Sequence, residues 1–463
     1  MAFDIRETAF KLPENWKLVR LGDIAKVNEK SLTKKSQPDF IRYIDISSVS
    51  TGAFDTPKLL KKDEIPSRAK RILRNNDFII STVRPNLKQF SFIEEAQENL
   101  IASTGFCVIS SNNSKLAWYL YSLITSDLFT EYLVKIADGG AYPAFNPKEI
   151  EDAIIPLPDK DNLEFISDTS RFFHKKIQLN TQINQTLEQI AQALFKSWFV
   201  DFDPVRAKVQ ALSDGLSLEQ AELAAMQAIS GKTPEELTAL SQTQPDHYAE
   251  LAETAKAFPC EMMEVDGVEV PKGWEVKELG SLMTIKRGGS PRPIKDFISD
   301  KGLNWVKISD ATAEDNPFLF STKEYIKSEG LSKTVLLKKG SLILSNSATP
   351  GLPRFLELDA CIHDGWLYFS DIKSLTQEYL YFFFLNIRKD LVAQGNGSVF
   401  TNLKTDIVKA QKAIVPDERA ICYFDKQVKS IMNLIRYNTA NSVSLKETRD
   451  LLLPRLLNGE LNG

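Results

Sequence analysis

Two long segments of the chain carry apolar residues at the alternating three- and four-residue spacing that is typical of coiled-coil helices. They run from Phe172 to Trp198 and from Phe424 to Leu457. The seam positions of the first hold Phe173, Ile177, Asn180, Asn184, Leu187, Ala191 and Leu194, and those of the second hold Val428, Ile431, Ile435, Asn438, Ser442, Leu445, Arg449 and Leu452. A polar residue at such a position lowers stability and specifies register, and both segments place one at the same point. The pattern predicts two long helices packed on each other; the alternative is that each lies only on its own domain.

The sequence before each long helix alternates short runs of β-branched and aromatic residues with turn residues, a pattern typical of strands. A helical stretch follows in both places, around residues 115–135 and 375–393. We therefore expect two globular domains of roughly 150 residues, each mixing helices and strands.

The two domains are predicted to be copies of each other. LPENWKLVRLGDI, starting at Leu12, is matched by VPKGWEVKELGSL, starting at Val270, and the offset between Trp16 and Trp274 is 274 − 16 = 258 residues. The long helices keep this offset, since Asn180 corresponds to Asn438. The repeat predicts an α+β fold with two pseudo-symmetric α/β domains at 1–158 and 267–420, helical regions at 159–206 and 421–463, and a connector at 207–266.

The connector has no counterpart after the second domain. From Ala207 to Asp266 it contains three lysines and eleven acidic residues, a net charge of 3 − 11 = −8. Its Ala-, Glu- and Leu-rich composition predicts two or three short helices. The run SGKT at residues 230–233 ends like a phosphate-binding loop, but the glycine required five residues before Gly231 is Met226. Thr233 to Glu236 instead predicts a capping box that begins a helix.

Charge and composition narrow the class of protein. The chain has a net charge of −4, so the residues outside the connector carry −4 + 8 = +4, and basic residues cluster between Lys58 and Lys88. A local basic field attracts a polyanion whatever the total charge, so nucleic-acid binding stays open. Four scattered cysteines and three histidines argue against disulfides and metal sites. With no secretion signal or membrane-spanning run, we expect a cytoplasmic protein. The sequence also contains no convincing catalytic constellation, which favours a role in binding and positioning.

At this point the residues resemble a known family, the specificity (S) subunits of type I restriction-modification systems. The most specific of them form IAQALFKSWFVDFDPVRAK, which closes the first half, and RDLLLPRLLNGEL near the C-terminus. The resemblance covers essentially the whole chain except the acidic connector, which is longer than in many members.

The resemblance implies a DNA-binding subunit that catalyses nothing. Its two target recognition domains would each read one half of a split, asymmetric sequence in double-stranded DNA. Its helices would form an antiparallel coiled coil and dock two methyltransferase (M) subunits, which carry S-adenosylmethionine and methylate adenine at N6. An ATP-driven restriction (R) subunit, with Mg, can join them, and this chain itself would hold no cofactor. The first helix, counted from Phe172 to Trp198, would span about 40 Å at ~1.5 Å per residue and set the unread spacer.

Basic and amide side chains in both domains are candidates for DNA contact. In the first domain we expect Arg68, Lys70, Arg71 and Lys88 to bind phosphates and Arg84 and Asn86 to contact guanine and adenine edges. In the second domain the candidates are Lys286, Arg287, Arg292, Lys295, Asn346, Thr349 and Arg354. Tyr142 and Ser398, in paired glycine-rich loops, complete the set. The alternative for each is a solvated surface side chain.

The seam residues Ile177, Asn180, Leu187, Leu194, Ile435, Asn438, Leu445 and Leu452 are the predicted coiled-coil contacts. Trp198 and Phe199 belong to an aromatic cluster at the end of the first helix. This cluster is expected to pack on the opposed helix or to anchor a methyltransferase subunit.

Two other functions remain open from the sequence. The chain could be a fused DNA methyltransferase or nuclease-type enzyme, which would act without partners. It could also be a protein scaffold that binds no DNA. A gel shift at low and moderate salt would distinguish the two, because binding to phosphates must weaken as salt rises.

Overall fold

The computed structural model describes residues 3–8, 12–138, 140, 142–265, 267–312, 316–395 and 403–460. The chain divides into two compact units. The first unit is Met1–Asn180 with Asn441–Gly463, and the second is Thr181–Ala440. Each unit therefore contains one globular domain and a length of both long helices.

The first domain contains two four-stranded sheets, in the orders β6-β3-β10-β7 and β2-β11-β8-β9, and the pairs β1-β12 and β4-β5. Its strands are β1 (Lys17–Arg20), β2 (Lys26–Val27), β3 (Phe40–Ile44), β4 (Val49–Ser50), β5 (Ala53–Phe54), β6 (Lys58–Lys61), β7 (Ala69–Ile72), β8 (Asp77–Ser81), β9 (Phe90–Ile93), β10 (Leu100–Ser103), β11 (Phe106–Ser110) and β12 (Ile154–Leu157).

The second domain repeats this arrangement with one more strand in each large sheet, in the orders β16-β25-β22-β23-β19 and β17-β20-β18-β24-β21. The pair β15-β26 matches β1-β12, and a hairpin β13-β14 precedes it. The strands are β13 (Met262–Val265), β14 (Val268–Pro271), β15 (Glu275–Glu278), β16 (Thr284–Arg287), β17 (Ile298–Ser299), β18 (Leu303–Val306), β19 (Phe318–Leu319), β20 (Glu324–Ile326), β21 (Val335–Leu337), β22 (Leu342–Ser345), β23 (Pro353–Leu356), β24 (Ala360–Ile362), β25 (Trp366–Ser370) and β26 (Lys412–Val415). Even the parallel pair β3·β10 recurs, as β18·β24, so the predicted duplication is confirmed.

A fully buried strand separates two cores in each domain. Because side chains alternate across a strand, β8 contributes Phe78 and Ile80 to one hydrophobic core and Ile79 to another. In the second domain β22 does the same with Leu342 and Leu344 on one side and Ile343 on the other. The turn that follows each of these strands is therefore held on a rigid support.

The helices are α1 (Leu21–Ile24), α2 (Ser114–Ile124), α3 (Asp127–Ile136) and α4 (Pro147–Glu151) in the first domain, and α10 (Leu279–Leu282), α11 (Ile308–Thr312), α12 (Gln377–Gly395) and α13 (Thr405–Lys409) in the second. At the 258-residue offset α1 matches α10, α4 matches α13, and α12 spans most of the positions of both α2 and α3. The single helix expected at 115–135 is wrong, because Ser126 accepts a hydrogen bond from the amide of Phe129 and begins a second helix. The expected helix at 375–393 is observed as α12.

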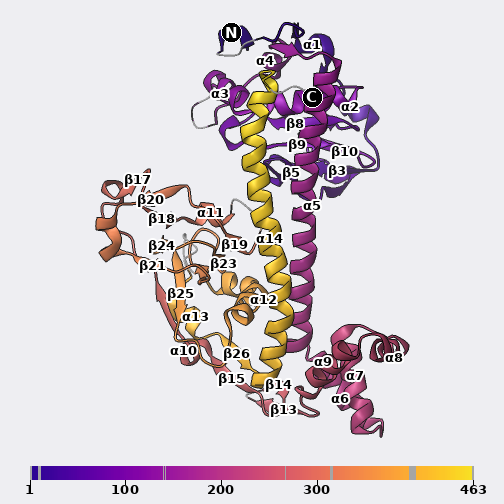
Figure 1. Ribbon diagram of the computed structural model, residues 1–463, viewed down its shortest axis with the longest axis vertical. Coiled ribbons are helices and arrows are strands. Elements are labelled where there is room, and N and C mark those ends of the chain that lie inside the picture. The colour runs from indigo at the N-terminus through magenta and orange to yellow at the C-terminus, as the bar shows by residue number, and fades with distance from the viewer. Residues whose placement is uncertain are drawn as a thin grey trace. The chain divides into compact units, whose positions relative to one another are not determined.

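The long helices are α5 (Lys160–Phe199) and α14 (Glu418–Leu457), each of 40 residues (Figure 1). Both begin earlier than predicted, because Asp159 and Asp417 accept hydrogen bonds from amides of the first turn. At ~1.5 Å per residue each spans about 60 Å, so the expected 40 Å is too short.

The two helices run antiparallel within each unit. In the first unit Asn180 contacts Ser442, and Ile166 belongs to the same core as Leu456. In the second unit Asn184 contacts Asn438, and the ring of Trp198 lies 6.0 Å from that of Phe424. Residue numbers thus rise along α5 as they fall along α14, and the predicted packing of the helices on each other is confirmed.

The connector forms four helices, where two or three were expected: α6 (Asp203–Ser213), α7 (Leu218–Ser230), α8 (Pro234–Thr243) and α9 (Pro245–Lys256). The predicted capping box of Thr233 and Glu236 is present at the start of α8. The helices α7, α8 and α9 share a small core of their own, which includes Met226, Leu237 and Leu251.

Candidate nucleic-acid interface

The turn between β8 and β9 exposes the predicted base-contacting residues of the first domain. Arg84 and Asn86 are exposed on either side of Pro85. The backbone of Arg84 is left-handed, with φ of 50°, and so is that of Lys88. Left-handed backbone is uncommon for residues other than glycine and is often found where a site needs a particular side-chain direction.

The glycine-rich loop of the first domain lies against this turn. The amide of Arg84 donates to the carbonyl of Pro143 at 2.7 Å, and the amide of Phe145 donates to the carbonyl of Thr82 at 3.0 Å. The guanidinium carbon of Arg84 lies 4.4 Å from the ring centroid of Tyr142. Tyr142 is 68% exposed, so the structure brings these two predicted residues together at the surface.

The second domain has the same arrangement around its turn between β22 and β23. We call this arrangement, a buried strand whose following turn is hydrogen-bonded to a second loop, the frame. The amide of Leu403, which matches Phe145 at the 258-residue offset, donates to the carbonyl of Asn346 at 2.7 Å. A further pair also recurs, because the amides of Thr82 and Asn346 donate to the carbonyls of Gly105 and Gly365. Two predicted loops therefore meet at an equivalent hydrogen bond in both domains.

The basic run of the first domain lies on and before β7. Arg68 and Lys70 are exposed, whereas Arg71 is half-buried. Lys88 forms an ion pair with Asp127 at 2.5 Å. These cations remain available to a polyanion to different degrees, with Arg68 and Lys70 the most accessible.

Asp364 gathers several predicted residues of the second domain. Its carbonyl accepts hydrogen bonds from Arg287 at 2.8 Å and from the side-chain amide of Asn346 at 3.2 Å, and its carboxylate lies 3.6 Å from Arg292. The hydroxyl of Ser290 donates to the same carboxylate and lowers the pKa of Asp364. Sequence reasoning missed Asp364 and Ser290; the signal was the motif HDGW, which matches STGF in the first domain.

The remaining candidates of the second domain are placed differently from one another. Lys286 and Lys295 are exposed, and Thr349 is half-buried. Asn346 and Arg354 are buried, and Arg354 donates to the carbonyls of Ala311 and Pro353. Ser398 lies outside the described residues. The buried pair has partners inside the domain, which favours the exposed lysines and arginines as DNA contacts.

Buried polar residues occupy the helix seam in both units. In the first unit the amide of Asn180 donates to Asn441 at 3.0 Å and to Ser442 at 3.1 Å. In the second unit the amide of Asn438 donates to Asn184 at 3.0 Å. The 258-residue offset maps 180 onto 438 and 184 onto 442, so both units use the same two positions of the repeat with the partners exchanged.

The apolar seam residues are buried to varying degrees. Ile435 is buried, and Ile177, Leu187, Leu194, Leu445 and Leu452 are half-buried. Trp198 and Phe199 are buried in the core of the second unit, where both rings contact Phe424 of α14. Their position agrees with one of the two interpretations of this cluster, in which it packs against the opposed helix.

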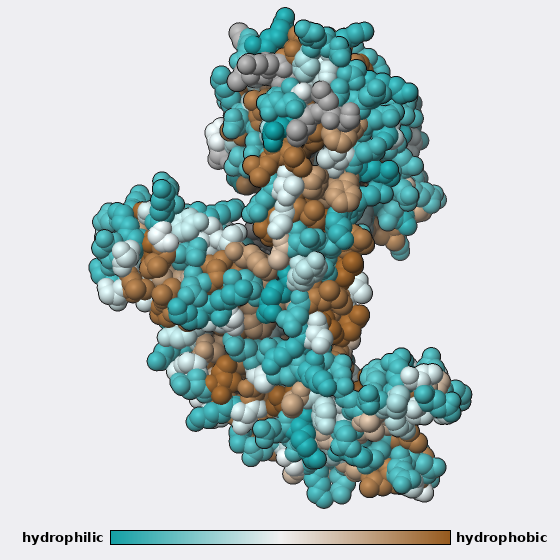
Figure 2. Space-filling model, in the orientation of Figure 1, coloured by the Kyte–Doolittle hydropathy of each residue, from teal (hydrophilic) through white to brown (hydrophobic). Residues whose placement is uncertain are grey.

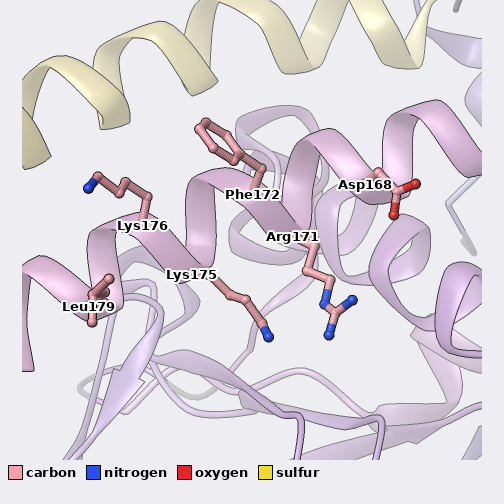
Figure 3. Close-up of a pocket in the computed structure, with 6 residues that line it drawn as sticks. All are labelled: Asp168, Arg171, Phe172, Lys175, Lys176 and Leu179. Carbon is pink, nitrogen blue, oxygen red and sulfur yellow. The ribbon is translucent and has the colours of Figure 1, made fainter.

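One face of α5 is apolar and exposed. In the first unit Phe165, Phe172 and Leu179 follow a seven-residue spacing that places them on one side of the helix, and Figure 2 shows apolar surface along the part of α5 in view. Beside them is a shallow hollow of about 400 Å³ lined by Asp168, Arg171, Phe172, Lys175, Lys176 and Leu179 (Figure 3). Arg171 and Lys175 pair with Glu94. An apolar stripe with cations beside it is typical of a protein-binding surface.

Among the described residues, no cluster of three or more His, Cys, Asp or Glu side chains is placed to hold a metal ion. Within the same residues, no helix combines the length and the apolar character needed to cross a membrane.

A family model described as "Type I restriction modification DNA specificity domain" matches residues 13–189 and again residues 271–439. The chain therefore belongs to the family of type I restriction-modification specificity subunits, whose members determine the DNA target and are the non-catalytic components of their enzymes.

Particular relatives match along their whole length. The chain is 42% identical over 472 residues to the type I restriction enzyme HindI specificity subunit of Haemophilus influenzae. The alignment covers 96% of this chain and 100% of the relative. It is 22% identical over 476 residues to the MjaIX specificity subunit of Methanocaldococcus jannaschii, with 97% and 94% covered. The crystal structure of a type I restriction-modification S subunit from M. genitalium aligns over 96% of this chain and 97% of that one, with 13% identity and a TM-score of 0.49.

Proposed function

We propose that each domain of this specificity subunit reads one half of a bipartite sequence in double-stranded DNA. The observation that carries the proposal is the recurrence of one frame, a buried strand followed by a turn tied to a second loop, in two domains with different side chains. Equivalent frames support equivalent roles, and different side chains support the reading of different bases. The exposed residues Arg68, Lys70, Arg84, Asn86 and Lys286, with Arg287, Arg292 and Lys295, are the proposed contacts.

The proposed division of the chain follows from this assignment. Residues 1–158 and 267–420 are the two recognition domains, and 159–206 and 421–463 are the helical regions that join them. The acidic connector at 207–266 forms a helical cluster with its own core.

The long helices are the proposed docking site for two methyltransferase subunits. The exposed apolar stripe of α5 supports this role, because Phe172 leaves 61% of its surface exposed and Leu179 leaves 48%. S-adenosylmethionine would then be bound by the methyltransferase subunits. ATP and Mg would be bound by a restriction subunit where one joins the complex.

A domain exchange tests the proposal. The chain is expressed with its partner methyltransferase, residues 1–155 are replaced by those of another family member, and methylated DNA is sequenced. One half of the methylated sequence should change while the other half and its orientation stay. Exchange of residues 267–420 is the matched control and should change only the other half. If both halves or neither half change in either exchange, the division of labour is wrong.

Two measurements separate this proposal from the alternatives. The purified chain with S-adenosylmethionine and DNA should transfer no methyl group, whereas a fused methyltransferase would. A gel shift of the complex at two salt concentrations should weaken as salt rises, because phosphate contacts release counterions. A complex that assembles but does not bind DNA at low salt would support the scaffold alternative.

A further inference from the structure

The left-handed residue of the turn is shared by both domains. Arg84 is the third residue after Ser81, where β8 ends, and Ala348 is the third residue after Ser345, where β22 ends. The φ angles are 50° at Arg84 and 58° at Ala348. Because neither residue favours this conformation and the two side chains differ, the backbone at this position belongs to the frame. Only the first domain places a long side chain there.

The side chain at this position in the first domain is held by an aromatic ring. The guanidinium of Arg84 lies over Tyr142 at 4.4 Å from the centroid, and both residues are exposed. The two backbones are also joined, because the amide of Arg84 donates to Pro143 at 2.7 Å. Stacking on a ring fixes the plane in which the guanidinium presents its N–H donors.

A fixed plane of donors matters for a base and much less for a phosphate. Lysine and arginine both bind phosphate by charge, and the exposed Arg68 and Lys70 of the same domain supply such charges. The edge of guanine in the major groove presents O6 and N7 side by side, and these accept two parallel hydrogen bonds from one guanidinium. The geometry of Arg84 and Tyr142 therefore suits a guanine better than any other partner on DNA.

We propose that Arg84 reads a guanine in the half-site of the first domain and that Tyr142 is the positioning residue that holds its guanidinium. This inference rests on the proposed function, since it requires the first domain to read a half-site. It adds Tyr142, the residue that orients the reader, to the guanine contact that the sequence leads us to expect of Arg84.

The test uses the full chain assembled with its methyltransferase subunits and measures competition binding. The half-sites are first read from methylated DNA, and duplexes are then made with every single base change in the first half-site. Arg84→Lys keeps the charge but loses the fork, so it should lower discrimination at one guanine by about 5-fold to about 150-fold and leave the second half-site unchanged. Tyr142→Ala should lower discrimination at the same position, and Tyr142→Phe, which keeps the ring, should restore it.

Lys70→Met, at an exposed lysine of β7 in the same domain, is the control variant. It should weaken binding to all sequences alike and reduce the dependence on salt, as loss of a phosphate contact does. The inference is overturned if the first half-site contains no guanine, if Arg84→Lys weakens all sequences equally, or if it changes nothing. An effect of Arg84→Lys without one of Tyr142→Ala overturns the role of Tyr142. A wild-type complex without a bipartite target would instead contradict the proposed function.

Discussion

After β8 the first domain carries Arg84, Asn86 and Lys88 on a turn bound to a neighbouring loop, whereas after β22 the second domain carries Ser347, Ala348 and Thr349 on a turn bound in the same way. The second domain places its exposed cations elsewhere, at the end of β16 and on the segment that follows it, around Asp364. The hydrogen-bonded frame is thus common to both domains, and the positively charged surface is not. This comparison indicates that folding constrains the frame while recognition is left to a few exposed side chains.

The comparison extends to the ends of the long helices, where it predicts the largest effect. Trp198 of α5 is buried in the second unit, and Leu456 of α14, its match at the 258-residue offset, is buried in the first. We expect Trp198→Ala to lower the free energy of unfolding by about 3–5 kcal/mol and Leu456→Ala by about 2–5 kcal/mol, through cavities in different cores. Hydrogen exchange should localise the first loss to the second unit and the second loss to the first.

The exposed Leu451 supplies the control for this experiment, because its side chain is 73% exposed and Leu451→Ala should change stability by less than about 0.5 kcal/mol. If both core variants loosened the same unit, the matched ends would not serve separate cores.

The second largest effect concerns the pH dependence of stability, because α5 carries a histidine where α14 carries a methionine. His174 of α5 is matched by Met432 of α14. Burial, with the charge of Arg449, lowers the pKa of His174 to about 4, while Glu94 opposes and Lys175 reinforces this shift. Between about pH 6.5 and about pH 4 the unfolded chain binds a proton that the folded chain excludes. This histidine should therefore cost the first unit up to about 3 kcal/mol as the pH falls through that window.

His174→Met installs the residue of the matched position and should remove this dependence. Denaturant unfolding at several pH values gives the free energy of unfolding of the wild type and of the variant. The difference between the two removes the contribution of the carboxylates that titrate in the same pH range. Curves that stay parallel from pH 7 to pH 4 would show that folding does not lower the pKa of His174.

The smallest predicted effect concerns two matched glutamates. Glu94 directly follows β9, and Glu357 directly follows β23. The side chain of Glu357 is 2% exposed and pairs with Arg436 at 2.6 Å and Lys339 at 3.0 Å, whereas that of Glu94 is 33% exposed. We expect Glu357→Gln to cost about 2 kcal/mol, because a charged hydrogen bond is lost in a buried site, and Glu94→Gln to cost less than about 1 kcal/mol. Added salt should reduce only the second effect, and equal costs at both positions would contradict the assignment of burial.

The sequence predicted the duplication, the domain class and the pairing of the helices, because these follow from periodic patterns and from one offset. It missed the first turns of α5 and α14, which Asp159 and Asp417 cap, since the polar run after Asp159 hides the helical period. It also missed the break at Ser126 and the fourth connector helix, because short capped helices carry little apolar pattern.

The candidate site was predicted less completely, for a physical reason. Sequence shows that Arg354 and Arg84 are cations in matched segments, but only the fold shows that Arg354 points into the domain and Arg84 to the surface. The gathering of Arg287, Arg292 and Asn346 around Asp364 depends on segments far apart in the chain. Such a cluster has no signature in any one stretch of sequence.

The shared left-handed residue after β8 and β22 has a consequence for how such a protein can change over generations. Because the turn keeps its course with arginine in one copy and alanine in the other, a substitution there alters what is offered to a ligand without requiring the fold to be rebuilt. A single codon change at Ala348 could then supply a new donor to the second domain while its folding is preserved, so that preferences can diversify one residue at a time.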